Sequence, residues 1–279
     1  MNYRHVYHAG NFADIVKHSL LALILEQLKT KDKPFCVLDT HAGLGLYDLT
    51  GDEATRTGEF HQGIGRILGD PHAPEALRPY LDVVRGLNPD GLTCYPGSPW
   101  LARALLRPGD RLMACELHPD DRAALADLFA GDRAVRVFEL DGYLALKSFL
   151  PFKERRGVVL IDPPFEVRDE FERLGAGLAD GLRRFGTGIF IAWYPIKDRR
   201  PLTAFLARVR GLTDKWLTVE VTLRPETEST RLNGCGLLVL NPPWRLDAAL
   251  EGHIMPYFSR KLADDGAGGY LVERGTGIG

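Results

Sequence analysis

Apolar residues recur with a helical period near the start of the chain. They occupy positions 12, 15, 16, 20, 23, 24 and 28, which share one face of an α-helix. Asn11 precedes this run and can accept the first free backbone N–H groups, so the pattern predicts a capped helix from Phe12 to Lys29. Lys17 and His18 then lie in the middle of that helix, either within reach of a neighbouring sheet edge or solvated on an outer face.

Seven further segments are short and rich in apolar residues. Runs of this kind are typical of strands buried on both faces of a mostly parallel sheet. We predict strands at 35–39, 111–117, 135–140, 158–161, 188–193, 216–223 and 236–240, with helices between them. The last two are close enough to form an antiparallel hairpin at the end of the sheet. The predicted fold class is α/β, with a Rossmann-like, seven-stranded, mostly parallel sheet.

Residues 48–95 differ from the segments on either side. They contain scattered charges, glycines, and short helical patterns at 57–68 and 74–87, but no strong strand pattern. We therefore predict a small helical insertion subdomain at 48–95 within a core formed by 1–47 and 96–279, in which 1–30 is an N-terminal motif and helix. The glycine-rich tail from 264 to 279 is predicted to be partly disordered, with a short strand at 270–273.

Charge and cysteine content restrict the possible functions. The 35 Lys and Arg residues against 37 Asp and Glu give a formal charge of -2, unlike many nucleic-acid-binding domains. Any nucleic acid must then meet a local basic face, for which 155–156, 183–184, 197–200 and 208–210 are candidates. The four cysteines form no C-x-x-C pair, which predicts neither a disulfide framework nor a metal site and favours the cytoplasm. The longest apolar run falls far short of the roughly 20 residues that span a membrane.

Four of the predicted strands end in an acidic residue: Asp39, Glu116, Asp141 and Asp162. The carboxyl ends of parallel strands lie at one edge of a sheet, where ligands bind, so we expect these acids to converge. Asp39 opens an Asp-x-x-x-Gly-x-Gly turn whose glycines let the backbone approach a ligand closely. A carboxylate placed like Glu116 accepts hydrogen bonds from ribose hydroxyls, and the Asp141-Gly142 pair is placed to meet an adenine ring. The edge therefore predicts a nucleoside-containing cofactor.

Asp162 is followed by Pro163, Pro164 and Phe165. The prolines end the strand and leave it as a stiff, extended turn. This sequence resembles the [DNS]-P-P-[YFW] motif of amino-methyltransferases, which transfer a methyl group from S-adenosylmethionine to a nitrogen conjugated to a ring or carbonyl. The carboxylate and a backbone carbonyl can accept the two N–H groups of such an amine, while Phe165 stacks on a flipped base. A simply capped loop is the structural alternative.

A second sequence, Asn241-Pro242-Pro243-Trp244, fits the same consensus. Chain order separates the two. The acid-tipped strands arrive one per β-α unit, whereas Asn241 ends the last predicted hairpin. We therefore assign the chemistry to Asp162 and expect 241–244 to be structural or to line the substrate side.

Several short sequences together point to one family. They are Tyr3-Arg4-His5, His8-Ala9-Gly10-Asn11, Lys17-His18, Asp39-Thr40-His41-Ala42-Gly43, Tyr95-Pro96-Gly97-Ser98-Pro99, Glu116-Leu117-His118-Pro119 and Asp162-Pro163-Pro164. The combination resembles the RlmJ family of bacterial 23S ribosomal RNA adenine-N6 methyltransferases over nearly the whole chain. The His-rich opening and the Tyr-Pro-Gly-Ser-Pro stretch are not general methyltransferase features, which makes the resemblance specific.

The resemblance implies a class I S-adenosylmethionine-dependent methyltransferase fold, S-adenosylmethionine as cofactor and 23S ribosomal RNA as substrate. The implied catalytic residue is Asp162, which accepts the amine proton, and the implied RNA contacts are Tyr3 and Phe165. Phe165 departs from the tyrosine that is commoner in the family, but a ring suffices for stacking. We expect a cytoplasmic monomer without metal or membrane partner. The implied cofactor contacts are His18, His41, Ser98, Glu116, Asp141, Gly142 and Asp162.

Other interpretations remain open from the residues alone. Ser98, followed by Pro99, is expected to cap a helix over 99–106 if it does not contact the cofactor. Methylation of DNA adenine or of a protein glutamine amide is compatible with the same Asp-Pro-Pro-aromatic sequence. A nucleic-acid-binding module that has lost turnover is the non-enzymatic alternative, and the intact acid-tipped strands argue against it.

Overall fold

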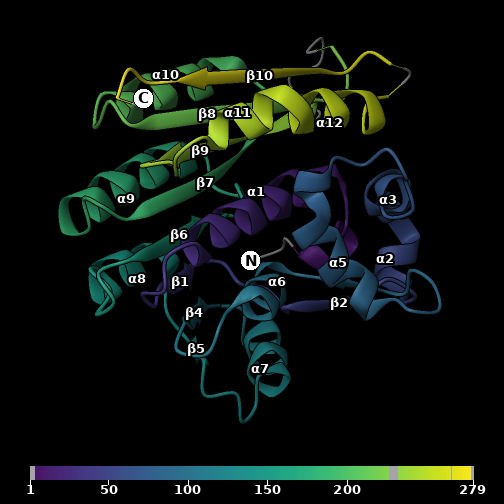
Figure 1. The fold of residues 1–279 in the computed structure, drawn as a ribbon, viewed down its shortest axis with the longest axis horizontal. Coiled ribbons are helices and arrows are strands. Elements are labelled where there is room, and N and C mark those ends of the chain that lie inside the picture. Colours follow the sequence, from purple (N-terminus) through teal and green to yellow (C-terminus); the bar gives the residue numbers. More distant parts are fainter. Residues whose placement is uncertain (1–3, 226–231, 265, 278–279) are drawn as a thin grey trace.

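A single eight-stranded sheet organises the molecule (Figure 1). The structure, a computed structural model, describes residues 4–225, 232–264 and 266–277. The strands lie in the order β10-β8-β9-β7-β6-β1-β4-β5. Their bounds are β1 Cys36–Asp39, β4 Arg111–Cys115, β5 Val135–Phe138, β6 Gly157–Ile161, β7 Ile189–Ile196, β8 Trp216–Thr222, β9 Gly234–Leu240 and β10 Gly269–Arg274.

The strand directions confirm a mostly parallel α/β sheet. Strands β5, β4, β1, β6 and β7 are parallel to one another, whereas β9 is antiparallel to both β7 and β8, as the predicted hairpin requires. The chain order reverses between β1 and β6. Such a switch point is where ligands bind in open α/β sheets, outside the carboxyl ends of the strands. Asp39 and Asp162 flank it.

The prediction of seven strands was one too few. The eighth, β10, pairs antiparallel with β8 over six residues of the glycine-rich tail. The sequence predicted only a short strand here, because the apolar residues of this segment do not form the pattern of a buried strand. Tyr270 is 44% exposed and Leu271 is 39% exposed. Backbone pairing with β8, rather than burial, therefore defines this edge strand.

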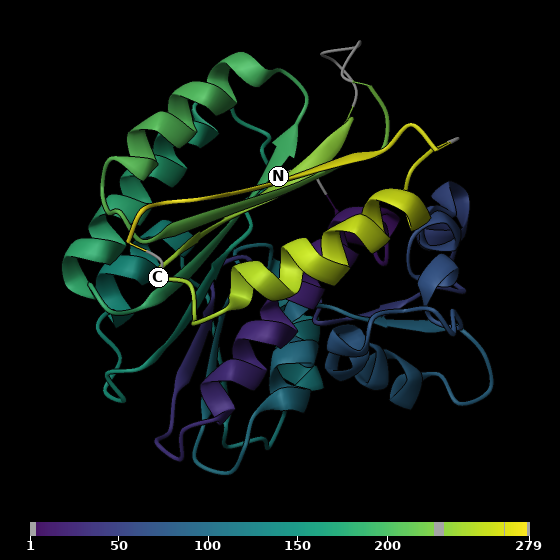
Figure 2. The ribbon, with the colours of Figure 1, turned by 45° about the horizontal axis from the view of Figure 1, so that its top comes forward.

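Helices cover both faces of the sheet (Figure 2). One face packs against α1 (Phe12–Lys29), α6 (Ser98–Leu105), α7 (Pro119–Leu128) and α12 (Met255–Lys261). The other packs against α8 (Gly142–Phe149), α9 (Glu170–Arg184) and α10 (Arg199–Arg210). A short helix α11 (Leu246–Ala249) and a π-helical turn at Leu250–Ile254 lead into α12. In the described ranges, no helix has both the length and the apolar character needed to cross a membrane.

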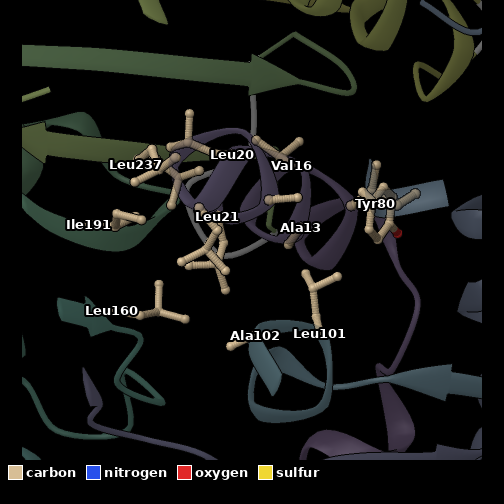
Figure 3. Close-up of a cluster of buried hydrophobic side chains, with 14 of the residues drawn as sticks. Ala13, Val16, Leu20, Leu21, Tyr80, Leu101, Ala102, Leu160, Ile191 and Leu237 are labelled. Atoms are coloured by element: carbon tan, nitrogen blue, oxygen red, sulfur yellow. The ribbon is translucent and has the colours of Figure 1, made fainter. Parts of the chain in front are cut away.

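Helix α1 lies directly on the sheet, which fixes the polar side chains that the helix carries. Leu21 is fully buried and lies among side chains of α6, β6 and β7 that include Leu101, Leu160 and Ile191, all likewise fully buried (Figure 3). Burial of a leucine or isoleucine side chain contributes about 1.5–3 kcal/mol. The helix therefore has little freedom to shift along the sheet.

The segment between β2 (Leu46–Asp48) and β3 (Cys94–Pro96) is helical. Its elements are α2 (Asp52–Thr57), α3 (Glu59–Gln62), α4 (Ile64–Ile67), a 3-10 turn Glu75–Leu77 and α5 (Arg78–Leu87). The predicted helix at 57–68 is broken at Gly63, where an added Cβ would come within 2.0 Å of the Gly10 carbonyl oxygen. The small pairing of β2 with β3 escaped the sequence pattern because each strand has three residues.

Candidate active site

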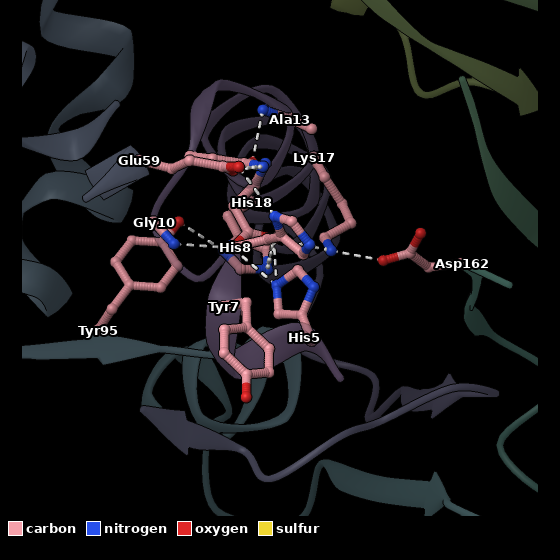
Figure 4. A network of polar contacts seen from close by, with 12 residues as sticks. His5, Tyr7, His8, Gly10, Ala13, Lys17, His18, Glu59, Tyr95 and Asp162 are labelled. Atoms are coloured by element: carbon pink, nitrogen blue, oxygen red, sulfur yellow. Dashed lines mark hydrogen bonds and ion pairs between the residues drawn. The ribbon is translucent and has the colours of Figure 1, made fainter. Parts of the chain in front are cut away.

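Helix α1 delivers a buried ammonium group to the carboxyl end of β6. As predicted, Asn11 caps the helix, and its Oδ1 accepts from the backbone N–H groups of residues 13 and 14 at 2.9 and 3.1 Å. Lys17 follows one turn later and is 5% exposed. Its Nζ lies 2.5 Å from Asp162 Oδ2 and 3.0 Å from Asp14 Oδ1, so one lysine bridges two carboxylates (Figure 4). The alternative of a solvated Lys17 is thereby excluded.

The two carboxylates keep Lys17 charged. Burial alone would lower the pKa of Lys17, but attraction to Asp14 and Asp162 raises it well above its usual value. Burial likewise opposes ionisation of Asp14, yet His5 and Lys17 hold its pKa well below the usual range. The Asp162 side chain is 19% exposed, and in the described part of the chain its Oδ1 makes no hydrogen bond. One oxygen of Asp162 is therefore held by Lys17, and the other can accept a hydrogen bond from a ligand.

The N-terminal segment reaches the same site. His5, in a 3-10 turn at His5–Tyr7, places its Nε2 2.9 Å from Asp14 Oδ2 and packs its ring edge-on against Tyr47 at 5.3 Å. Tyr3, the predicted RNA contact, lies outside the described residues. Lys17 and Asp14 were not among the predicted site residues. Their i, i+3 spacing on a helix predicted to pack on the sheet was the available signal.

An aromatic wall stands beside Asp162. The backbone of Phe165 has φ +52, an uncommon conformation for a side chain of this size. Its ring packs edge-on against Phe171 at 4.9 Å and Trp193 at 5.7 Å. Phe165 thus forms an aromatic cluster with Phe171 and Trp193 directly after the Pro-Pro turn. Its stacking on a base stays a prediction.

The loops after β1 and β5 meet closely. A Cβ added to Gly142 would lie 2.5 Å from the Thr40 carbonyl oxygen and 2.8 Å from His41 Cε1, so only glycine permits this approach. Asp141 caps α8 by accepting from the N–H groups of Tyr143 and Leu144. Thr40 Oγ1 lies 2.8 Å from His41 Nδ1, and burial lowers the pKa of His41 to about 4. The predicted cofactor residues His41, Asp141 and Gly142 are therefore brought together.

Glu116 holds the glycine turn in place. Its Oε2 accepts from Gly43 N–H at 2.8 Å and its Oε1 from His118 N–H at 2.7 Å. The carboxylate is 7% exposed. Since each carboxylate oxygen has further lone pairs, Glu116 can still accept from a ligand hydroxyl.

Ser98 is not a helix cap. Gly97 occupies the N-cap position of α6, because the backbone there lies 2.8 Å from the Gly45 carbonyl and an added Cβ would be crowded by Tyr47. Ser98 instead lies close enough to Asp39 to lower the pKa of that carboxyl. Burial outweighs this effect and raises the pKa of Asp39 to about 6. The structure thus places Ser98 beside Asp39, the acid at the end of β1, and its contact with the cofactor stays a prediction.

Two buried polar atoms at this edge lack partners in the described ranges: Asp39 Oδ2 and His18 Nε2. His18 Nδ1 lies 2.8 Å from the Tyr95 hydroxyl, and burial lowers the pKa of His18 to about 3, so the ring is neutral. Buried polar groups without partners are rare unless a ligand or water supplies one. Together with the close approach at Gly142, they fit a bound molecule with polar groups between β1 and its neighbours.

The second Pro-Pro sequence lies at the opposite edge of the sheet. Because β9 runs antiparallel to β7, its carboxyl end meets the start of β7 rather than the end. Asn241 Nδ2 donates to the carbonyls of Gly186 and Gly188 at 2.9 and 2.8 Å. Of the two predicted roles for Asn241, the structure supports the structural one, because Asn241 lies at the sheet edge opposite Asp162.

The fold and this edge define a class of protein. A mostly parallel sheet with acids at the strand ends around its switch point, and an Asp-Pro-Pro-aromatic turn beside them, is the arrangement of an S-adenosylmethionine-dependent methyltransferase. S-adenosylmethionine is its methyl donor.

Comparison with known proteins then gives the family. The family model described as "Ribosomal RNA large subunit methyltransferase D, RlmJ" matches residues 32–275. The chain belongs to this RlmJ family of ribosomal RNA large subunit methyltransferases. Proteins named "Ribosomal RNA large subunit methyltransferase J" from Escherichia coli and Haemophilus influenzae are 42% and 40% identical, over 96% and 98% of both chains. A Legionella pneumophila crystal structure superposes with a TM-score of 0.91, at 33% identity, over 98% of this chain and 100% of that one.

Proposed function

We propose that the protein methylates the N6 amine of an adenine in 23S ribosomal RNA, with Asp162 accepting the amine proton. The observation that supports this most is the position of Asp162 and its contact with Lys17. Asp162 directly follows β6 at the switch point, and Lys17 holds one oxygen at 2.5 Å while the side chain is 19% exposed. The names of the two bacterial relatives, given above, support a large-subunit ribosomal RNA as substrate.

Residues of the chain supply orientation and charge. An adenine N6 lone pair is delocalised into the ring, so the amine becomes nucleophilic only when its N–H groups are held by acceptors. Asp162 accepts one N–H, and a backbone carbonyl of the Pro163-Pro164 turn accepts the other. Lys17 holds one carboxylate oxygen of Asp162, so the other oxygen is the acceptor for the proton that the amine loses as it is methylated.

The cofactor site is proposed at the neighbouring strand ends. Bound S-adenosylmethionine supplies the electrophilic methyl group. Glu116 accepts from ribose hydroxyls, and Asp141 with Gly142 meets the adenine ring. His18, His41 and Ser98 complete the pocket next to the unsatisfied Asp39 oxygen.

The RNA is proposed to enter over the aromatic wall. Phe165 stacks on the flipped adenine, and Tyr3 contacts it from the N-terminal side. Extrusion of the base from its neighbours exposes the amine to Asp162. The basic stretch at 197–200 follows β7 at the same edge, where it can meet phosphates.

Transfer of a labelled methyl group from S-adenosylmethionine to unmodified 23S RNA, followed by nucleoside analysis, tests the proposal. We expect N6-methyladenosine with the intact chain and a loss of at least about 100-fold in kcat for Asp162→Asn, which removes a proton acceptor. Calorimetry should show cofactor binding in that variant. Full activity of Asp162→Asn would refute the assignment. Methyl transfer to DNA or to a protein amide, without transfer to RNA, would show that the proposed RNA substrate is wrong.

A further inference from the structure

Asp14 makes several contacts beside Asp162 that the proposed mechanism does not explain. It lies in the first turn of α1 and is 1% exposed. Its Oδ1 lies 3.0 Å from both Lys17 Nζ and His5 Nε2. Its Oδ2 lies 2.9 Å from His5 Nε2 and accepts from Gly10 N–H at 2.9 Å. One buried carboxylate thus joins α1, the 3-10 turn before it and the loop between them.

The backbone is shaped for this contact. Gly10 has φ +76, and an added Cβ would come within 3.1–3.3 Å of Ile64, Phe60 and Tyr95. In this left-handed conformation its N–H turns toward Asp14. Burial of a carboxylate is costly unless hydrogen bonds and opposite charge compensate it. Here Gly10 and His5 supply the hydrogen bonds and Lys17 supplies the opposite charge.

We propose that Asp14 is a positioning residue for methyl transfer. It shares the Lys17 ammonium with Asp162 and ties the segment 5–10 to the catalytic carboxylate. This inference rests on the proposed function, because it concerns how Asp162 is prepared.

The physical basis is the division of one ammonium between two acceptors. Lys17 has three N–H donors, and Asp14 takes up part of its charge. Without Asp14, Asp162 alone balances Lys17, so the ion pair tightens and Asp162 becomes a poorer acceptor for the amine. His5 and Gly10 lose their shared acceptor at the same time, so the N-terminal segment no longer keeps its position over the site.

A change of Asp14→Asn isolates the charge, since the amide has nearly the same shape. We expect kcat to fall about 10- to 100-fold, the loss that a misplacement of about 1 Å produces. Cofactor affinity should stay within about threefold of that of the intact protein, because the change removes no contact with the ligand. Asp14→Glu, which keeps the charge, should recover part of the loss.

The pH profile separates positioning from simple folding support. The titratable groups around Lys17 are Asp14, His18, His5, Asp39, Asp162, Tyr80 and Cys235. Removal of the Asp14 charge lowers the pKa of Lys17, so the alkaline limb of kcat should move down by about 1–3 pH units. Glu59→Gln is the matched control: Glu59 also holds this segment, through His8 and Asn11 at 2.9 and 3.0 Å, but does not touch Lys17. Its alkaline limb should not move.

A double-mutant cycle gives the decisive result. If Asp14 acts through Lys17, the effect of Asp14→Asn on kcat should shrink to within about threefold in a Lys17→Met background. Equal effects in both backgrounds, or an unmoved alkaline limb, would overturn the inference. If Asp14→Asn does not fold, Asp14→Glu replaces it in the cycle, and an effect of Asp14→Glu on kcat that is equal in the intact and the Lys17→Met backgrounds would overturn the inference. The proposed function fails separately, through absence of N6-methyladenosine in the unmutated protein.

Discussion

Replacement of Lys17 by methionine tests the electrostatics on which the active site depends. The change keeps the apolar stem of the side chain and removes the ammonium group between two carboxylates. Asp14 is 1% exposed, so its charge would be left buried with a weaker set of partners. Breaking a buried ion pair from one side destabilises a protein by about 3–5 kcal/mol. For a chain of 279 residues, an unfolding entropy of about 2.1 cal/mol/K per residue converts this into a fall in Tm of about 5–9 °C.

The loss of stability in Lys17→Met should depend on pH with a definite sign. The pKa of Asp14 is depressed in the folded state, so its stabilising contribution is present above its unfolded pKa and is lost as pH falls through the folded value. The pKa of Lys17 is raised, so its contribution is complete below its unfolded pKa and is lost as pH rises through the folded value. The difference in Tm between the two proteins should therefore be largest between about pH 5 and pH 10 and should shrink on either side.

Thermal unfolding followed by circular dichroism at several pH values measures this difference. Lys29→Met, on the same helix, is the matched control, because Lys29 pairs with the more exposed Glu26 near the helix end. Its effect should stay within about 1 kcal/mol, as expected for a surface pair. A Tm of Lys17→Met that equals that of Lys29→Met, or a difference that does not vary between about pH 3 and pH 7, would refute the electrostatic account.

Two further variants test the cofactor pocket and the second Pro-Pro sequence. Gly142→Ala places a Cβ 2.5 Å from the Thr40 carbonyl oxygen, so calorimetry should show weaker S-adenosylmethionine binding together with a loss of about 1–3 kcal/mol of stability; unchanged affinity would mean that these loops do not shape the pocket. Asn241→Ala leaves two carbonyls without donors, so we expect a loss of about 1–3 kcal/mol in chemical denaturation with the methylation rate of the folded protein retained. An inactive but fully folded Asn241→Ala would move the chemistry to the second motif.

Much of the fold could be predicted because local and global signals agree. Helix α1 has the predicted bounds, since an unbroken 3.6-residue period follows a residue that can cap it. The buried strands were recognisable from runs such as 158–161, which are apolar on both faces. The tail strand β10 gave a weaker signal because pairing with β8, and not burial of its own side chains, holds it in the sheet.

The contacts of the candidate site were less predictable because they join distant segments. Lys17 and Asp162 are 145 residues apart, and only the packing of α1 across the sheet brings them together. Ser98 shows a second limit. The Ser-Pro pair predicts a cap, but the backbone contact between Gly97 and Gly45 sets where α6 begins, which turns Ser98 toward Asp39. Tertiary packing overrode local preference in both cases.

The two Pro-Pro sequences show that strand direction, rather than the motif, decides where chemistry can occur. Both follow a buried strand, and both Phe165 and Asn241 adopt a positive φ. The strand before Asp162 is parallel to β1 and delivers its acid to the edge where Lys17 lies. The strand before Asn241 is antiparallel to β7 and delivers its amide to the opposite edge, where it binds the carbonyls that precede β7. A change of motif alone, such as Asn241→Asp, therefore cannot create a second methylation site, since neither Lys17 nor the carboxyl ends of β1 and β6 lie at that edge.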